Sequence, residues 1–429
     1  MLRLLHLSDI HFETPRCLVE RTDRDARIRD LILADALEKV EKHKKPFDVI
    51  VVTGDIAAKA DPEEFEVAGE WLKKVAHTLG TEKENIFVVP GNHDVMRKIA
   101  DSRPVKGIRD SILCKSNEIR NLEFERCLRE VSSTKILMEP LEAYNNFAGN
   151  YGCTVWPPER AFWEELIPID KFYQLRLIGL TSVFFSSSED KKGNLYMGDI
   201  QTNFGNSPEI VNLVMSHHPT GWLDDGDEIA DDFSRATIRL VGHQHRQRQL
   251  KDEAGVLFTA GAVNPSRLEV GGYEPAYNIL DIMVDNGGEE PSLKIEAHLR
   301  KYQRAPEMFV AITAQDGGSF FQYEFPLDRA VVQIPPPLVE PVEIDVSASS
   351  EPIKVVQEMS QNNIPSSRAI FIRLWGLPSG LRRQIIDKLG HLSEDEWKLP
   401  DFERTRLALS YSEGHGKLVE LIKEIEEKE

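Results

Sequence analysis

Cysteine is scarce in this sequence, and long apolar runs are missing. The 429 residues contain four cysteines, Cys17, Cys114, Cys127 and Cys153, and none of them forms a C-x-x-C pair. This number excludes a disulfide-stapled scaffold and favours a reducing, cytoplasmic compartment. No run of about 18 apolar residues occurs, so we expect no membrane-spanning helix. The apolar start is interrupted by His6 and Asp9 and lacks a small-residue cleavage site, which argues against a signal peptide.

Positive charge is also in short supply. Lysine and arginine number 52 against 71 aspartate and glutamate residues, which gives a formal net charge of -19. Proteins that grip nucleic acid through bulk charge use clustered Lys and Arg, so the balance argues against that mode of binding. It leaves open an enzyme that meets a phosphate through metal ions, because bound cations invert the local charge. The length and the 41% hydrophobic content are ordinary for a globular chain of two or three domains.

The first 95 residues alternate between strand and helix patterns. Short apolar or β-branched runs at 2–7, 48–53 and 86–89 predict buried strands. Between them, apolar residues at helical spacing predict helices over 23–40 and 65–79. This order predicts an α/β domain with the strands at its centre.

A different pattern follows over 97–170. The segment is richer in polar residues and has helical spacing near 119–131 and 136–147, so we expect a mostly helical insertion that caps the core. Strand patterns then resume at 175–181, 211–215, 237–241, 256–260, 277–284 and 293–299. Because no clear helix separates the last three, we expect them to form an antiparallel run.

The C-terminal part is set apart by composition. Residues 334–341 read IPPPLVEP, and consecutive prolines favour an extended linker, which we place at 334–353. Residues 1–300 would form the main domain and 301–333 its extension. Residues 354–429 would form a small helical domain, with helices expected at 381–389, 402–411 and 417–425.

Five short motifs follow predicted strands in order. They are Asp9-x-His11, Gly54-Asp55, Gly91-Asn92-His93-Asp94, His217-His218-Pro219 and Gly242-His243-x-His245. Open α/β sheets bind ligands beyond the carboxyl ends of their strands, so we expect these side chains to converge. Carboxylate, amide and imidazole donors together suit borderline metals such as Mn, Fe, Zn or Co.

The spacing within the motifs also favours a metal centre. Residues separated by one in an extended segment point the same way, so Asp9 and His11 can reach one ion. The carboxylate of Asp55, at the tip of a glycine turn, can bridge two ions. The glycines at 54, 91 and 242 are expected to allow tight turns with positive φ. Each motif alone also fits an ordinary turn or strand end, but their ordered occurrence favours the metal.

These motifs resemble those of the calcineurin-like metallophosphoesterase superfamily, over roughly residues 1–300. The resemblance implies a two-sheet β-sandwich flanked by helices and a centre of two divalent transition-metal ions. One ion would be held by Asp9, His11, Asp55 and His245, and the other by Asp55, Asn92, His217 and His243. Mn2+ is the expected metal, with Fe, Zn, Co and Ni as alternatives.

The resemblance assigns further roles beside the metals. His93 would stabilise charge on the phosphate and protonate the leaving alkoxide, and Asp94 would orient it. His217 would be the ligand of its motif, which leaves His218 as a neighbour of the ligands or a substrate-pocket residue. Arg246 flanks the last ligand and can contact a substrate phosphate or take part in a structural salt bridge.

The tail carries a second resemblance. Leu407–Tyr411 and His415–Lys423 resemble the last helices of bacterial effector-associated domains, which are death-fold-like modules that pair effectors with partners in conflict systems. The same spacing also fits a helical dimerisation or packing appendage, so self-association through the tail is the alternative to a protein partner. Because all metal motifs lie before residue 250, we expect the tail to be separable from the chemistry.

The expected reaction is phosphoester hydrolysis, and three functions compete. The first is a phosphodiesterase or nuclease acting on nucleic acid or nucleotides, recruited as an effector in bacterial defence. The second is a small-molecule phosphatase or a cyclic-nucleotide phosphodiesterase, which the acidic net charge favours. The third is an interaction module that uses the esterase fold as a scaffold, which the intact set of seven expected ligands disfavours.

Overall fold

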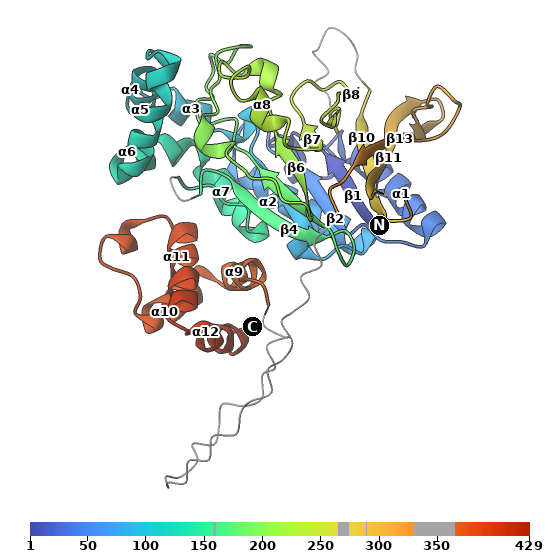
Figure 1. Cartoon of the computed structure of the whole chain (residues 1–429). Coiled ribbons are helices and arrows are strands. Elements are labelled where there is room, and N and C mark those ends of the chain that lie inside the picture. The colour runs from blue at the N-terminus through green and yellow to red at the C-terminus, as the bar shows by residue number, and fades with distance from the viewer. Residues whose placement is uncertain (158–159, 265–273, 289, 330–364) are drawn as a thin grey trace, which may run out of the picture.

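The computed structural model describes residues 1–157, 160–264, 274–288, 290–329 and 365–429. These residues form two β-sheets flanked by helices, followed by a group of C-terminal helices (Figure 1). The expected two-sheet α/β architecture is confirmed. The Pro-rich linker expected at 334–353 lies outside the described residues. No helix within the described ranges is long and apolar enough to span a membrane.

The first sheet carries three of the five motif loops. Its strands run in the order β12-β11-β10-β1-β2-β3, and β13 also pairs with β11. The strands are β1 (Leu2–Leu7), β2 (Val49–Val52), β3 (Ile86–Val88), β10 (Ala276–Asp285), β11 (Ser292–Arg304), β12 (Glu307–Ala311) and β13 (Phe321–Pro326). Because β1, β2 and β3 are parallel, the loops that follow them lie at one edge of the sheet.

The second sheet carries the other two motif loops, after β6 and β7. Its order is β4-β5-β6-β7-β9-β8, with β5, β6, β7 and β9 parallel and the edge strands antiparallel. The strands are β4 (Trp163–Pro168), β5 (Gln174–Gly179), β6 (Ile210–Ser216), β7 (Ile238–Val241), β8 (Arg248–Lys251) and β9 (Val256–Thr259). Neighbours on β6 fall into different clusters: Leu213 faces the core shared by both sheets, and Val214 faces a smaller outer cluster.

Helices cover the sheets and form the insertion. They are α1 (Ala26–His43), α2 (Pro62–Leu79), α3 (Arg97–Ala100), α4 (Arg103–Leu113), α5 (Asn117–Arg129), α6 (Val131–Met138), α7 (Glu142–Ala148) and α8 (Ala230–Phe233). The start of α2 is well specified, because Asp61 and Glu64 form a capping box around Pro62. Gly80 ends the helix in the left-handed region, with φ 73°.

Two details of the expected strand order are wrong. The helical insertion does not reach residue 170, because β4 is the edge strand of the second sheet. The sequence hides this strand, because the polar Glu165 lies on its less exposed face and the apolar Leu166 on its exposed face. The last three expected strands do not form one antiparallel run: β10 pairs with β11, whereas β9 pairs with β7 in the other sheet. Apolar spacing alone does not show to which sheet a strand belongs.

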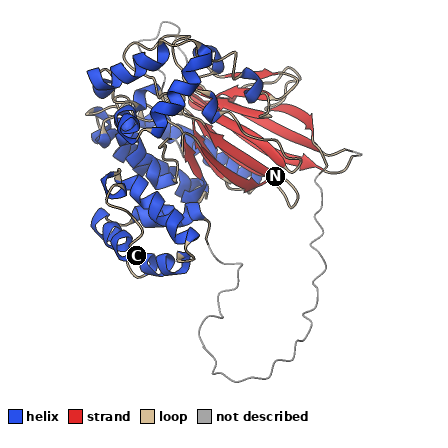
Figure 2. Ribbon diagram, turned by 60° about the vertical axis from the view of Figure 1, so that its left-hand side comes forward, coloured by secondary structure: helices blue, strands red, loops and turns tan. Residues whose placement is uncertain are grey.

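The C-terminal helices are α9 (Ser367–Gly376), α10 (Ser379–Leu389), α11 (Asp401–Gly414) and α12 (Leu418–Glu426). They share a small core of their own, which includes Ile370 and Leu421. Figure 2 shows them beside the other helices, with the strands on the opposite side of the view. They are not a detached appendage: Phe402 belongs to the large core and packs on Trp156, with ring centroids 5.8 Å apart. The tail is therefore packed against the rest of the chain, although we expected it to be separable from the chemistry.

Candidate metal centre

Residues from all five motifs meet at the carboxyl ends of the strands. Asp9, His11, Asp55 and His245 place ligand atoms within 4.8 Å of one another, and His217, His218 and His243 form a second such group. Asn92 joins the second group, because its Oδ1 lies 3.1 Å from His217 Nε2 and 3.1 Å from His243 Nδ1. The structure thus brings all seven expected ligands into one site.

Asp55 lies between the two groups. Its Oδ2 is 3.9 Å from His11 Nε2 and 3.4 Å from His217 Nε2. Its Oδ1 accepts a hydrogen bond from the backbone N–H of His93, at 2.8 Å. One carboxylate oxygen therefore faces both groups, while the other holds the carboxylate in place.

The donor set fits divalent metal ions. The Nδ1 of His217 donates to Thr53 O at 2.8 Å, since a carbonyl oxygen only accepts, so the ring's lone pair lies on Nε2. That lone pair faces the oxygens of Asp55 and Asn92, which is unfavourable unless a proton or a cation lies between them. In the other group, the Nε2 atoms of His11 and His245 are 3.3 Å apart. Buried imidazoles and carboxylates that face one another in this way are suited to sharing cations.

The electrostatics of the site agree with this arrangement. Burial lowers the pKa of His11 to about 4 and that of His243 to about 4. Both rings are therefore neutral at neutral pH and can offer a lone pair to a metal ion. For His217, burial opposes protonation, but the carboxylates of Asp55 and Asp9 prevail and raise its pKa to about 9. A position that attracts a proton so strongly also attracts a metal cation.

The backbone of the motif loops is strained. Seven non-glycine residues of the described chain have positive φ, and five of them are expected ligands: Asp9, His11, Asp55, His243 and His245, with φ between 52° and 67°. Residues with a side chain rarely adopt this region, and such strain gathers at functional sites. Here the positive φ angles turn the ligand side chains inward from tight loops.

The motif glycines act differently from the expectation. Of the three, only Gly54 has positive φ, at 90°. Gly91 has φ -102° and is needed for close approach, because a Cβ there would lie 2.8 Å from Asp55 Cγ. A Cβ at Gly242 would lie 2.8 Å from Thr53 O and 3.0 Å from Asp9 Oδ2. These two glycines let the loops pack against ligand-bearing backbone.

His93 lies beside the groups and belongs to neither. Its ring centroid is 4.9 Å from that of His11, and its Nδ1 donates to Ala58 O at 2.8 Å. The Nε2 atom is 3.5 Å from the guanidinium of Arg97. Asp94 differs from its expected role of orienting this ring: its carboxylate instead accepts from the backbone N–H groups of Ile56, Ala57 and Gly91. Asp94 thereby ties the Asp55 loop to the Asn92 loop.

Of the two positions expected for His218, a neighbour of the ligands or a residue of the substrate pocket, the structure shows the first. It is fully buried, its Nδ1 lies 2.9 Å from Ser182 Oγ, and its ring packs against His243 with centroids 4.4 Å apart. It does not line the pocket over the metal groups. That position leaves it as a buried neighbour of the ligands.

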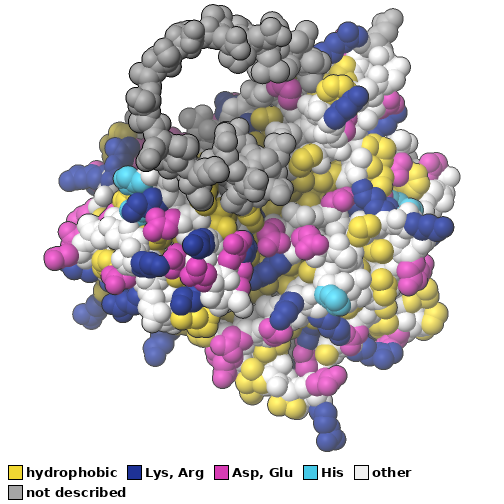
Figure 3. All heavy atoms as spheres, turned by 90° about the horizontal axis from the view of Figure 1, so that it is seen from below, with side chains coloured by type: hydrophobic (Ala, Val, Ile, Leu, Met, Phe, Trp, Pro, Cys, Tyr) yellow, Lys and Arg dark blue, Asp and Glu magenta, His cyan; other side chains and the backbone are white. Residues whose placement is uncertain are grey.

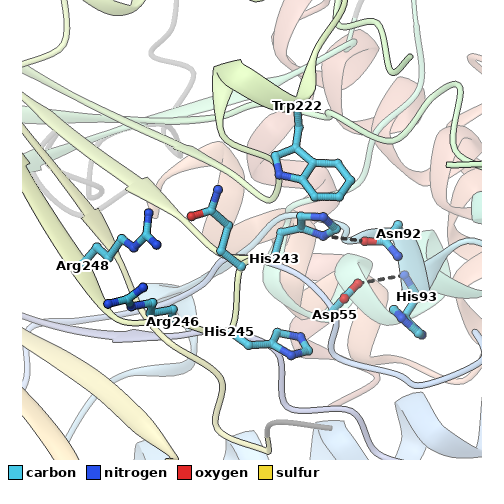
Figure 4. A pocket seen from close by; sticks show the side chains of 9 residues that line it. Asp55, Asn92, His93, Trp222, His243, His245, Arg246 and Arg248 are labelled. Carbon is cyan, nitrogen blue, oxygen red and sulfur yellow. Dashed lines mark hydrogen bonds between the residues drawn. The ribbon is translucent and has the colours of Figure 1, made fainter. Parts of the chain in front are cut away.

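A pocket of about 470 Å³ opens over the centre (Figure 4). It is lined by Asp55, Asn92, His93, Trp222, His243, Gln244, His245, Arg246 and Arg248. Arg246, expected either to contact a substrate phosphate or to form a structural salt bridge, lines this pocket. Trp222 was missed as a pocket residue. A large aromatic residue three positions after Pro219, in a loop next to a ligand motif, is the signal that could have identified it.

Comparison with known proteins agrees with the site. Residues 2–247 match the family model of the calcineurin-like phosphoesterases, and residues 366–427 match that of the GTPase-associated adaptor domain. A curated relative, the uncharacterized metallophosphoesterase-like protein YydB of Bacillus subtilis, is 23% identical over 306 residues, which cover 67% of this chain and 58% of the relative. The match therefore spans little more than half of the relative's length.

The solved structures that the comparison matched are distant in sequence. GAP50, the anchor in the inner membrane complex of Plasmodium, is 11% identical with a TM-score of 0.39, over 76% of this chain and 89% of that one. Vps29 of Chaetomium thermophilum is 8% identical with a TM-score of 0.28, over 78% and 100%. The family match covers more than half of the sequence, and we conclude that this chain belongs to the calcineurin-like phosphoesterases, a family of metal-dependent phosphoric ester hydrolases.

Proposed function

We propose that the chain is a two-metal phosphodiesterase that acts on nucleic acid or nucleotides. The observation that carries the proposal is the single Asp55 oxygen that faces both ligand groups. In this proposal one ion is held by Asp9, His11, Asp55 and His245, and the other by Asp55, Asn92, His217 and His243. Mn2+ is the proposed metal, because carboxylate and imidazole donors are mixed in both groups and the second group adds the amide of Asn92.

A bound metal pair of this kind supplies an activated water and neutralises charge on the phosphate. Hydrolysis breaks one P–O bond, and the leaving oxygen must gain a proton. We assign that transfer to His93, because it lines the pocket and its Nδ1 donates to Ala58 O, so that Nε2 is the ring nitrogen left for the proton. Asp94 supports the geometry by holding the Asp55 and Asn92 loops through three backbone N–H groups.

The shape of the pocket favours a diester over a monoester. The pocket continues from the ligand groups to Arg246 and Arg248 on one side and to Trp222 on another (Figure 4). A phosphate placed over Asp55 therefore has room for a substituent in more than one direction. A monoester phosphatase or a cyclic-nucleotide phosphodiesterase would use only part of this space.

We further propose that the adaptor region, residues 366–427, recruits a protein partner. The matched family is described as a GTPase-associated adaptor domain, so a GTPase is the partner class that this match supports. In this proposal the chain is an effector of bacterial defence. Cells that express it are expected to survive phage infection better than cells that express Asp55→Ala, and equal survival would contradict the defence role.

The activity is tested by metal reconstitution. The metal-depleted protein is supplied with Mn2+, Fe2+, Zn2+, Co2+ or Ni2+ and assayed on bis-p-nitrophenyl phosphate, p-nitrophenyl phosphate, cyclic nucleotides, and single- and double-stranded DNA. We expect Mn2+ to restore hydrolysis of the diesters. Hydrolysis of the monoester alone would make the protein a phosphatase and overturn the proposal.

A further inference from the structure

The net negative charge of this chain does not attract a polyanion, so any contact with nucleic acid must rest on a local group of residues. The net charge is -19, and on the face shown in Figure 3 acidic and basic side chains are interspersed. The pocket over the metal groups differs from this background. Beyond the ligands and His93 it is lined by Trp222, Gln244, Arg246 and Arg248, and Asp55 at its floor is the only carboxylate among its described lining residues.

The two arginines are presented together by the backbone. Gln247, between them, points inward, where its Nε2 donates to Tyr277 O and Asn278 Oδ1 at 2.9 and 2.7 Å. Arg246 and Arg248, on either side of it, both line the pocket (Figure 4). Both are exposed, and neither forms an ion pair with a described residue. They are free to meet a phosphate that lies next to the one over the metal groups.

Trp222 forms the facing wall. It ends the short turn Thr220–Trp222 directly after the His217 motif, and its backbone is held by Pro219 O and by the N–H of Gly193, both at 2.9 Å. Its ring meets that of His243 at 82°, with centroids 4.0 Å apart, and it is half-buried (Figure 4). A fixed aromatic ring beside a phosphate site is a platform on which an unpaired base can stack.

From this geometry we propose that Trp222, Arg246 and Arg248 bind a single-stranded oligonucleotide across the metal centre. An unpaired base lies on the Trp222 ring, and a phosphate next to the scissile one lies on the two guanidiniums. Duplex is disfavoured because its bases are stacked and paired, and are not available to the ring. This inference rests on the proposed phosphodiesterase function and names its substrate class.

The test compares a short single-stranded DNA oligonucleotide with bis-p-nitrophenyl phosphate, which has neither a base nor a second phosphate. The variants are Arg246→Gln with Arg248→Gln, Trp222→Leu and Trp222→Phe. The control is Arg126→Gln with Arg129→Gln on α5, which removes the same charge from side chains that are 82% and 72% exposed. Binding of a phosphorothioate oligonucleotide, followed by fluorescence anisotropy, gives a readout apart from turnover.

We expect the arginine variant to bind the oligonucleotide about tenfold more weakly. The slope of its log affinity against log salt concentration should fall by about one for each phosphate contact that is lost. Trp222→Leu should lower kcat/KM for the oligonucleotide by about 5- to 150-fold, the range of base stacking, and Trp222→Phe should keep most of it. Both losses should exceed those on the chromogenic diester, and the control should match the wild type.

Equal losses on the two substrates, unchanged oligonucleotide binding, or equal hydrolysis of duplex and single strand would each overturn the inference. The proposed function fails separately, if the wild type hydrolyses no diester with any metal. In that case the anisotropy measurement still decides whether the pocket wall binds single strands.

Discussion

The guanidinium of Arg368 lies over the ring of Phe87, with Cζ 4.1 Å from the ring centroid. The same group donates to Glu84 O at 3.1 Å and to Ile86 O at 2.8 Å. Arg368 belongs to α9 of the adaptor region, whereas Phe87 lies on β3, the edge strand of the first sheet. The adaptor thus satisfies backbone carbonyls at this edge of the sheet, beyond which the described residues add no further strand.

This contact lies next to the metal centre in sequence. β3 runs directly into the loop of Gly91, Asn92 and His93. Its last carbonyl, Val88 O, accepts from Tyr144 Oη and Trp163 Nε1, each at 3.1 Å. Side chains from the insertion, the second sheet and the adaptor therefore replace a neighbouring strand, and together they protect the edge from which the loop emerges.

Arg368→Ala should lower the free energy of unfolding by about 1–3 kcal/mol, because it leaves two carbonyl groups without their donor and removes a cation–π contact. The measurement is urea denaturation of the full chain. Arg383→Ala is the matched control, since Arg383 lies over Trp397 inside the adaptor region. If the two variants lose the same stability, the Arg368 contact does not hold the adaptor to the sheet.

Removal of residues 365–429 should yield a less soluble, less stable protein. The deletion exposes Trp156, which packs on Phe402, and removes Trp375, which a Cβ at Gly149 would approach to 2.6 Å. Light scattering and thermal unfolding of the truncated chain measure the effect. A truncated protein as soluble and stable as the full chain would show that the adaptor only rests on the catalytic domain.

Asp55→Ala should abolish hydrolysis and lose at least one metal ion per chain, because one oxygen faces both ligand groups. Elemental analysis of the purified variant gives the metal content. Asp252→Ala, at an exposed ion pair with Arg239, is the control and should keep full content. Full occupancy in Asp55→Ala would contradict the bridging assignment.

His93→Ala should keep both ions, while turnover falls about 10²- to 10⁴-fold, the usual range for a general acid. The loss should be smaller when the leaving group is p-nitrophenolate, which needs little proton transfer, than for an alkyl diester. Equal losses on the two esters would exclude the general-acid role of His93 and leave only its stabilisation of charge on the phosphate. A lost ion would make it a ligand.

Gly91→Ala should disrupt the centre although it adds one methyl group. The added Cβ would lie 2.8 Å from Asp55 Cγ, so either the carboxylate or the Asn92 loop must move. We expect lower metal affinity and activity. Gly107→Ala on α4 meets nothing within 4 Å and should stabilise the protein by about 0.5–1 kcal/mol, as Gly to Ala does inside a helix. Normal metal binding in Gly91→Ala would refute the close-approach argument.

The buried pair of Arg3 and Asp281 should make stability depend on pH. Arg3 Nε and Nη2 donate to the two carboxylate oxygens at 2.7 Å each. Burial works against the charge, but Arg3 and His298 prevail and hold the pKa of Asp281 well below its ordinary value. Because the folded pKa is lowered, the stabilisation is present above the unfolded value of about 3.9 and is lost as the pH falls below it.

Asp281→Asn should therefore cost about 3–5 kcal/mol between pH 5 and 8, roughly the cost of breaking a buried pair, and the difference from the wild type should shrink below about pH 4. Urea denaturation of both proteins across this range measures it. A difference that does not change with pH would mean that the carboxylate charge is not what stabilises the fold.

The sequence by itself determined the ligand types and their order along the chain. Asp9, Asp55, Asn92 and the four histidine ligands follow buried strands, and parallel strands bring their carboxyl ends to one edge whatever the rest of the chain does. Spacing was enough to identify these residues as ligands, although the backbone that carries Asp9 and His11 is not extended, since both have positive φ.

Only the tertiary structure decided which groups those side chains meet. Asp94 stands next to His93 in sequence, yet its carboxylate binds backbone N–H groups of the Asp55 loop. His218 stands next to a ligand and is buried, while Trp222 reaches the pocket from a loop. Arg368 crosses 282 positions to reach Ile86 O. The physical reason is that such contacts depend on the packing of both sheets and the adaptor, and residue spacing carries no information about distant partners.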